Sequence, residues 1–129
     1  MTRVQADIAP AIKDWLATEI ADAQVRLSVP DKWKPADGAL LIVADDGGPT
    51  LWPIKSQHTI RLTAYAAGRT EARAIVSLAA GLLGDGRPSG VASINSEMGS
   101  VLDARDSNTG AMLASVLLTA HARTVETEA

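Results

Sequence analysis

The sequence contains no cysteine and no phenylalanine, and only two of its 129 residues are histidines. Without cysteine there is no disulfide framework, no thiolate metal site and no cysteine nucleophile. The first ten residues carry no apolar leader, and no window approaches the roughly 18 consecutive apolar residues of a membrane-spanning helix. We therefore expect a chain without membrane contact, retained in the cytoplasm or assembled from there.

The composition is that of a globular domain. Hydrophobic residues make up 47% of the chain and charged residues 21%, and the net charge is −3. A length of 129 residues suits a single hydrophobic core, so we expect residues 1–129 to form one domain whose ends, residues 1–6 and 124–129, are flexible. The negative net charge argues against a nucleic-acid-binding module, which would show strongly salt-dependent affinity for DNA.

Apolar residues at spacings of three and four predict two helices. The first covers residues 8–20, with Asp7 as its expected N-cap, and the second follows Thr70, which is the second expected N-cap. The second helix is predicted to end at Gly84 and Gly86. Its apolar stripe consists of Ala72, Ile75, Val76, Ala79, Leu82 and Leu83.

Alternating and continuous apolar runs predict five strands between and after these helices. They cover residues 25–29, 39–44, 57–66, a short segment within 90–98, and 112–123. Acid- and glycine-rich turns at residues 45–48 and 106–110 precede the third and fifth strands. The order predicts an α+β fold of two layers, in which two helices pack on one mostly antiparallel or mixed sheet.

The residue types that carry catalysis are sparse and scattered. His58 and His121 lie in different predicted strands, and two histidines are too few for a typical zinc site. No serine stands in a Gly-x-Ser-x-Gly elbow, and no Ser/His/Asp order is recognisable. No catalytic, cofactor-binding or metal-binding residue is therefore predicted. A small ligand-binding or enzymatic α+β domain that uses His58 or His121 is kept as the rival interpretation.

The sequence points instead to interaction surfaces. Trp33 and Trp52 lie in predicted loops, where each either anchors a partner or fills the core. Arg61 and Tyr65 share the polar face of a long strand, and the acidic turns at residues 45–48 and 106–110 offer further surface carboxylates. The candidate interface residues are Trp33, Trp52, Asp45, Asp46, Arg61, Tyr65, Arg105 and Asp106.

Three segments together resemble the tail terminator, or tail completion, proteins of long-tailed (siphovirus-type) bacteriophages. They are the end of the first helix with WLATEIADAQVRLSVP, the strand–helix unit TIRLTAYAAGRTEARAIVSLAAGLL, and the closing DARDSNTGAMLASVLLTAHAR. The resemblance spans residues 7–123 and rests on patterns and not on catalytic signatures. The loop PDKWKPADG, which contains Trp33, matches no part of it.

The resemblance implies a structural virion protein without enzymatic activity or cofactor. Such proteins form rings, typically hexamers, that cap the tail tube, stop its polymerisation and join the tail to head-completion and neck proteins. DNA passes through the lumen of the ring without sequence readout. Another head–tail connector component, such as a stopper or an adaptor, is the nearest alternative that the resemblance leaves open.

Overall fold

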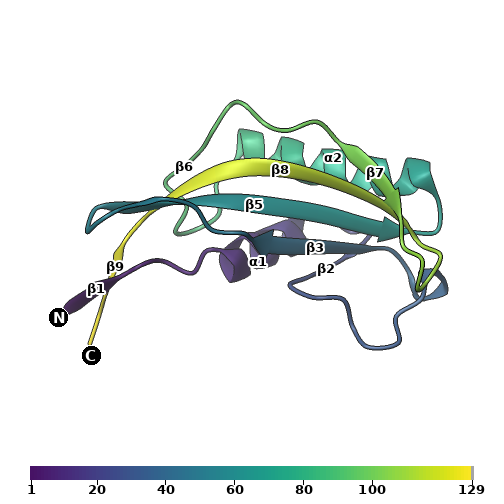
Figure 1. Cartoon of the computed structure of the whole chain (residues 1–129), viewed down its shortest axis with the longest axis horizontal. Coiled ribbons are helices and arrows are strands. Elements are labelled where there is room, and N and C mark those ends of the chain that lie inside the picture. Colours follow the sequence, from purple (N-terminus) through teal and green to yellow (C-terminus); the bar gives the residue numbers. More distant parts are fainter. Residues whose placement is uncertain (129) are drawn as a thin grey trace.

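The structure is a computed structural model that describes residues 1–128. Its two α-helices and mixed, mostly antiparallel sheet confirm the predicted α+β class (Figure 1). The elements run in the order β1 Thr2–Val4, α1 Ala9–Glu19, β2 Gln24–Arg26, the 3₁₀ turn Pro35–Asp37, β3 Leu40–Asp45, β4 Thr50–Leu51, β5 Lys55–Ala66, α2 Arg69–Asp85, β6 Ser93–Ile94, β7 Leu102–Arg105, β8 Met112–Arg123 and β9 Val125–Thr127.

Strands β5 and β8 form the centre of the main sheet. They pair antiparallel over 12 consecutive residues, from Lys55 opposite Arg123 to Ala66 opposite Met112. On one side β5 pairs with β3, which in turn pairs parallel with β2; on the other side β8 pairs with both β6 and β7. The short β4 folds back on the start of β5 as a hairpin. Among residues 1–128, β2 has only β3 as a neighbour, so it forms one outer edge of the sheet.

Both helices cover the same face of this sheet, and the strands pass in front of them in the view of Figure 1. The predicted alternation of β5 is confirmed, because every second residue from His58 to Ala66 is buried beneath the helices. We call this the inner face and the uncovered side the open face. The buried core joins residues of both helices and the three central strands: Ile8, Ile12, Leu16, Leu41, Val43, Ile60, Leu62, Ile75, Val76, Leu83, Val116 and Leu118.

The predicted helix caps are wrong. Ile8 and Gly68 occupy the N-cap positions of α1 and α2, and neither helix has a side-chain cap. Gly68 still has the extended backbone of the preceding strand, so α2 begins at Arg69 and Thr70 already lies inside it. Asp7 also lies outside α1, since the helix begins at Ala9 and Ile8, whose backbone angles are already helical, occupies the N-cap position.

Strand bounds also differ from the prediction in places. The segment expected at residues 25–29 pairs only over Gln24–Arg26, because the chain then turns away from β3. Strands β4 and β7 were not predicted: β4 has two residues, and all four residues of β7 are exposed, so neither shows an alternating pattern. The ends of the chain, expected to be flexible, are paired in the structure, with β1 and β9 forming a separate two-stranded antiparallel sheet. Residue 129 lies outside the described residues.

Candidate functional site

A hydrogen-bonded chain of serine, histidine and aspartate lies between β3 and β5. Ser56 and His58 both point to the inner face of β5, and Asp45 is the last residue of β3. Ser56 Oγ lies 2.6 Å from His58 Nε2, and His58 Nδ1 lies 2.6 Å from Asp45 Oδ2. The neutral imidazole with its hydrogen on Nδ1 satisfies both contacts, since Nδ1–H donates to the carboxylate and Nε2 accepts from the hydroxyl.

The hydrogen bonds join serine, histidine and aspartate in the same order as in the catalytic triad that activates a serine nucleophile. Its placement does not suit that chemistry, because Ser56 is 1% exposed and His58 4% exposed. A substrate cannot reach the Ser56 hydroxyl in this conformation. Asp45 also accepts a hydrogen bond from the backbone N–H of Gly47, at 2.8 Å. The hydrogen bonds among Ser56, His58 and Asp45 therefore fasten the turn after β3 to the beginning of β5, which is a structural role.

Sequence reasoning missed this hydrogen-bonded group because its three residues are not adjacent along the sequence. Ser56 and His58 are separated by one residue and so share a strand face, which was a readable signal. Asp45 lies 13 positions earlier, and only the antiparallel pairing of β3 with β5, in which Asp45 is opposite Ile60, brings it close. The turn interpretation of Asp45 was correct, since its Oδ1 holds the Gly47 amide.

The second histidine is not part of this group. His121 on β8 lies opposite Gln57 of β5, so it belongs to the open face, whereas His58 belongs to the inner face. His121 Nε2 lies 3.0 Å from Asn95 Oδ1, and its Nδ1 is buried without a hydrogen-bond partner. Within residues 1–128 no three His, Asp or Glu side chains are grouped as metal ligands would be.

The two tryptophans proposed as interface anchors have different environments. Trp33 is 6% exposed and packs with Leu40 and Ala111 at one end of the open face. Its ring meets Tyr65 edge to face, with centroids 5.8 Å apart, and its Nε1–H donates to the carbonyl of Gly38. Trp33 therefore fills a small second core and is not an exposed anchor. Tyr65 is likewise half-buried in this contact.

Trp52, in contrast, is exposed at the tip of the β4–β5 hairpin. Leu51, Trp52 and Ile54 are 57%, 56% and 60% exposed, so three large apolar side chains face solvent on four consecutive residues. We call residues 50–56 together with β1 and β9 the arm. In Figure 1 the arm lies at the end of the molecule that carries both termini.

Hydrogen bonds hold the arm in one conformation. The amide of Ile54 donates to the carbonyl of Leu51, and the amide of Thr124 donates to the carbonyl of Ile54. The Thr124 hydroxyl donates to the carbonyl of Pro53, and Arg3 donates through Nε to that hydroxyl oxygen and through Nη2 to the Thr124 carbonyl. The exposed tip is thus preorganised by strands from both ends of the chain.

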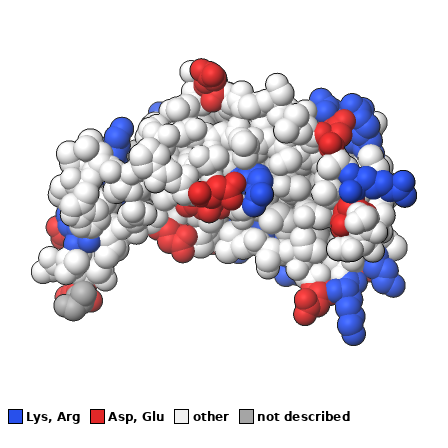
Figure 2. Space-filling view, in the orientation of Figure 1, with Lys and Arg blue, Asp and Glu red and all other residues white. Residues whose placement is uncertain are grey.

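The open face carries the remaining strand-face candidates. Arg61 forms an ion pair with Asp46 at 3.4 Å, and both side chains are about half exposed. Beside them is a shallow hollow of about 350 Å³, whose walls include Thr63, Leu102 and Leu113. Figure 2 shows few charges across the middle of this view, whereas Lys and Arg gather at its right-hand end. The face combines small polar and apolar side chains around one ion pair.

Arg105 and Asp106 lie at the end of the molecule opposite the arm, where β7 turns into β8. Arg105 is exposed, but Asp106 is occupied within the turn. Its two carboxylate oxygens accept hydrogen bonds from the amide of Asn108 and the hydroxyl of Thr109. The turn interpretation of this acidic loop is confirmed. The eight candidate interface residues therefore do not form one surface.

An additional ion-pair group near the start of α2 was not predicted. Arg69 Nε and Arg73 Nη1 lie 2.7 Å and 2.8 Å from the two carboxylate oxygens of Asp103 on β7. The hydrogen bond from Arg73 is the largest cause, and with Arg69 it holds the pKa of Asp103 below its usual range. Residues 69 and 73 are one helical turn apart, so the spacing placed both arginines on one side of α2. Their partner, 30 residues away on an unpredicted strand, gave no local signal.

Comparison of the chain with protein-family profiles, with curated protein sequences and with solved structures gives no match. Among the described residues, no helix is long and apolar enough to cross a membrane.

Proposed function

We propose that this protein is a structural subunit of a phage tail, a tail terminator that forms a ring on the end of the tail tube. The ring, a hexamer by the resemblance described above, stops tube polymerisation and joins the tail to the head-completion and neck proteins. It is assembled in the host cytoplasm and becomes part of the virion. The fold supports this proposal, since both helices lie on one side of a mixed sheet and leave its other face uncovered for contacts.

The exposed tip of the arm is the observation that carries the proposal. Leu51, Trp52 and Ile54 present three large exposed apolar side chains on a turn that hydrogen bonds hold in place. Large aromatic and aliphatic side chains of this kind anchor protein interfaces, and a preordered loop loses little conformational entropy when it docks. A subunit that must hold neighbours in a closed ring needs such a contact at a fixed angle to its body.

The charges agree with a lumen through which DNA passes without being gripped. The net charge is −3, and three of the arginines near the start of α2 and on the open face are paired with carboxylates. Paired guanidinium groups neutralise few phosphates, so sequence-independent affinity for DNA remains low. The rival interpretation, a ligand-binding or enzymatic site that uses His58 or His121, has less support, because His58 is only 4% exposed and the two histidines lie on opposite faces of the sheet and cannot share one site.

Two exposed leucines supply a matched test. Leu51 lies on the tip of the arm and is 57% exposed, whereas Leu78 lies on the outer side of α2 and is 47% exposed. Negative-stain microscopy of the purified protein, alone and mixed with tail tubes of its own phage, is expected to show rings or capped tubes. Leu51→Ser is expected to reduce both, and Leu78→Ser to leave both unchanged.

A protein that stays monomeric at high concentration and leaves tail tubes uncapped would refute the proposal. If Leu51→Ser and Leu78→Ser form rings and cap tubes to the same extent, the exposed tip of the arm does not support the proposal. The position of the protein on the intact particle, at the end of the tube or deeper in the neck, separates a terminator from a stopper or an adaptor.

A further inference from the structure

Two like charges lie side by side where the arm joins the main sheet. Lys55, the first residue of β5, is directly opposite Arg123, the last residue of β8. Such residues share a face of an antiparallel pair, with Cβ atoms about 4.5–5.5 Å apart, and like charges there are destabilising. Both side chains are exposed, and neither forms an ion pair among residues 1–128. Glu126, the nearest acid along the chain from Arg123, pairs with Arg3 at 3.1 Å.

A third cation lies close to this pair. A hollow of about 400 Å³ has Ala92, Arg123 and Val125 in its walls. Arg87 Nη1 donates to the carbonyl of Ala92 at 2.8 Å, so its guanidinium is held beside the same hollow. Arg87 also has no ion pair within the described chain. Because Val125 is 47% exposed, the hollow combines cations with apolar surface. We call Lys55, Arg87 and Arg123 the cationic root of the arm.

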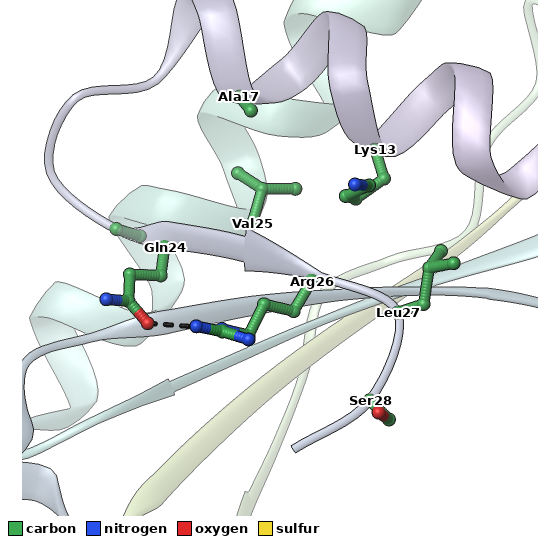
Figure 3. Close-up of a pocket in the computed structure, with 8 residues that line it drawn as sticks. Lys13, Ala17, Gln24, Val25, Arg26, Leu27 and Ser28 are labelled. Atoms are coloured by element: carbon green, nitrogen blue, oxygen red, sulfur yellow. Dashed lines mark hydrogen bonds between the residues drawn. The ribbon is translucent and has the colours of Figure 1, made fainter. Parts of the chain in front are cut away.

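The hollow beside β2 provides a contrast. It is larger, at about 560 Å³, and Lys13 and Arg26 are among the residues that line it. Lys13 pairs with Asp14 at 2.7 Å, and Arg26 donates through Nε to the side-chain oxygen of Gln24 (Figure 3). The side chains of these two cations thus already have polar partners within the chain. At the root of the arm, two cations oppose each other instead.

We propose that the cationic root binds an acidic segment of a protein other than this chain. A carboxylate between Lys55 and Arg123 relieves their repulsion and accepts charge-assisted hydrogen bonds from both. Both side chains point to the open face, because they alternate with the buried Ser56 and Ala122. This inference rests on the proposed function, which makes the end of the tail tube the surface to test.

The neighbours of the cations favour this kind of partner. Phosphates of DNA would neutralise the cations but would leave the exposed Val125 uncovered, whereas a polypeptide supplies carboxylates and apolar side chains together. A second copy is a poorer match, because within residues 1–128 no three His, Asp or Glu side chains are grouped. The counter-charge for three neighbouring cations therefore comes from a different protein.

Matched removal of charge tests this contact. The root variant, Lys55→Gln with Arg123→Gln, removes one lysine and one arginine. The control variant, Arg26→Gln with Lys32→Gln, removes the same charge from two exposed residues outside the arm, neither of which forms an ion pair among residues 1–128. Each is compared with the parent chain for ring formation, for capping of tail tubes of its own phage, and for binding of a hexaglutamate peptide at low salt.

We expect the root variant to form rings as the parent does, but to need about tenfold more protein to cap the same number of tubes, the order expected for two lost surface ion pairs. It should also bind hexaglutamate more weakly, while the control variant matches the parent in all three measurements. Without a partner, the root variant should melt at a higher temperature than the control, because the opposed charges are gone. Added salt should reduce this difference.

Equal capping and equal peptide binding by the two variants would overturn the contact while the proposed function stands. Loss of rings in the root variant alone would identify a second copy as the partner and overturn the choice of a different protein. Duplex DNA that binds more tightly than hexaglutamate, and only when the root is intact, would overturn the choice of carboxylates. A parent chain that forms no rings and caps no tubes, but binds hexaglutamate through the root, would overturn the proposed function and support the acidic contact.

Discussion

The Ser56–His58–Asp45 chain predicts a large loss of stability when its central member is replaced by an apolar side chain. His58→Leu keeps a similar side-chain volume, so the effect comes from hydrogen bonding and not from a cavity. Two hydrogen bonds of 2.6 Å are lost, one of them to a carboxylate. A neutral hydrogen bond contributes about 1 kcal/mol net, one to a charged group about 1.5–3 kcal/mol, and a buried hydroxyl left without a partner costs about 1–3 kcal/mol.

These terms overlap, because the unsatisfied Ser56 hydroxyl is part of the cost of losing its bond. We therefore expect His58→Leu to lower the free energy of unfolding by about 3–4 kcal/mol, a substantial part of the roughly 5–15 kcal/mol that a domain typically has. Equilibrium unfolding in urea at neutral pH measures this difference. Adding Ser56→Ala to the variant removes the unpaired hydroxyl and is expected to recover about 1 kcal/mol or more.

His121 supplies the control for this experiment. It is only half-buried, it has one side-chain hydrogen bond, and its Nδ1 is already without a partner. His121→Leu is expected to change stability by less than about 1 kcal/mol. If His58→Leu costs no more than His121→Leu, the buried chain does not fasten β3 to β5, and the structural role assigned to it is wrong.

Three further changes test other parts of the structure. Trp33→Ala is expected to cost about 3–5 kcal/mol in urea unfolding, because it empties the small second core; a cost below about 1 kcal/mol would contradict the burial of this ring. Asp103→Asn is expected to lower the melting temperature at neutral pH, because it removes the carboxylate that pairs with Arg69 and Arg73. Since the folded pKa of Asp103 lies below its ordinary value, the difference in melting temperature between variant and parent should shrink as the pH falls through that pKa. A difference that stays constant with pH would contradict the ion pairs. Gly48→Ala is expected to destabilise the protein by about 1–3 kcal/mol, because the added Cβ would lie 2.5 Å from a carbonyl oxygen of β5. Gly81→Ala, inside α2 with nothing within 4 Å of the added Cβ, should stabilise the protein by about 0.5–1 kcal/mol. The opposite order of melting temperatures would contradict the turn geometry.

The parts of the fold that sequence reasoning predicted are those with long, regular patterns. The alternation around Ile60 and Leu62 identified β5 and its buried face, and the last long strand was predicted to cover the residues it occupies in the structure. Both cases have enough repeats for the period of the hydrophobic pattern to outweigh individual residues. Strand β7 has four exposed residues, from Leu102 to Arg105, and is a strand only because β8 lies beside it.

The candidate site was less predictable, because the sequence does not say which loop residue turns inward. Trp33 and Trp52 both lie among prolines and polar residues, and local pattern treats them alike. One is buried because Tyr65 and Leu40 form a receptive surface beneath its loop, and the other is exposed because hydrogen bonds hold its turn away from the core. Such differences depend on contacts between distant segments, which appear only once the strands are in register.

The unbroken pairing of β5 with β8 has a mechanical consequence. Twelve residue pairs follow one another without a bulge, so at about 3.3–3.4 Å per residue the pair forms a stiff beam roughly 40 Å long. The arm is attached at one end of this beam, and Tyr65, which supports Trp33, lies near the other. A tilt imposed at the arm is therefore transmitted as a lever motion to the far end. In a ring, the orientation of one subunit's contact would set the position of the surface that it presents to the next component.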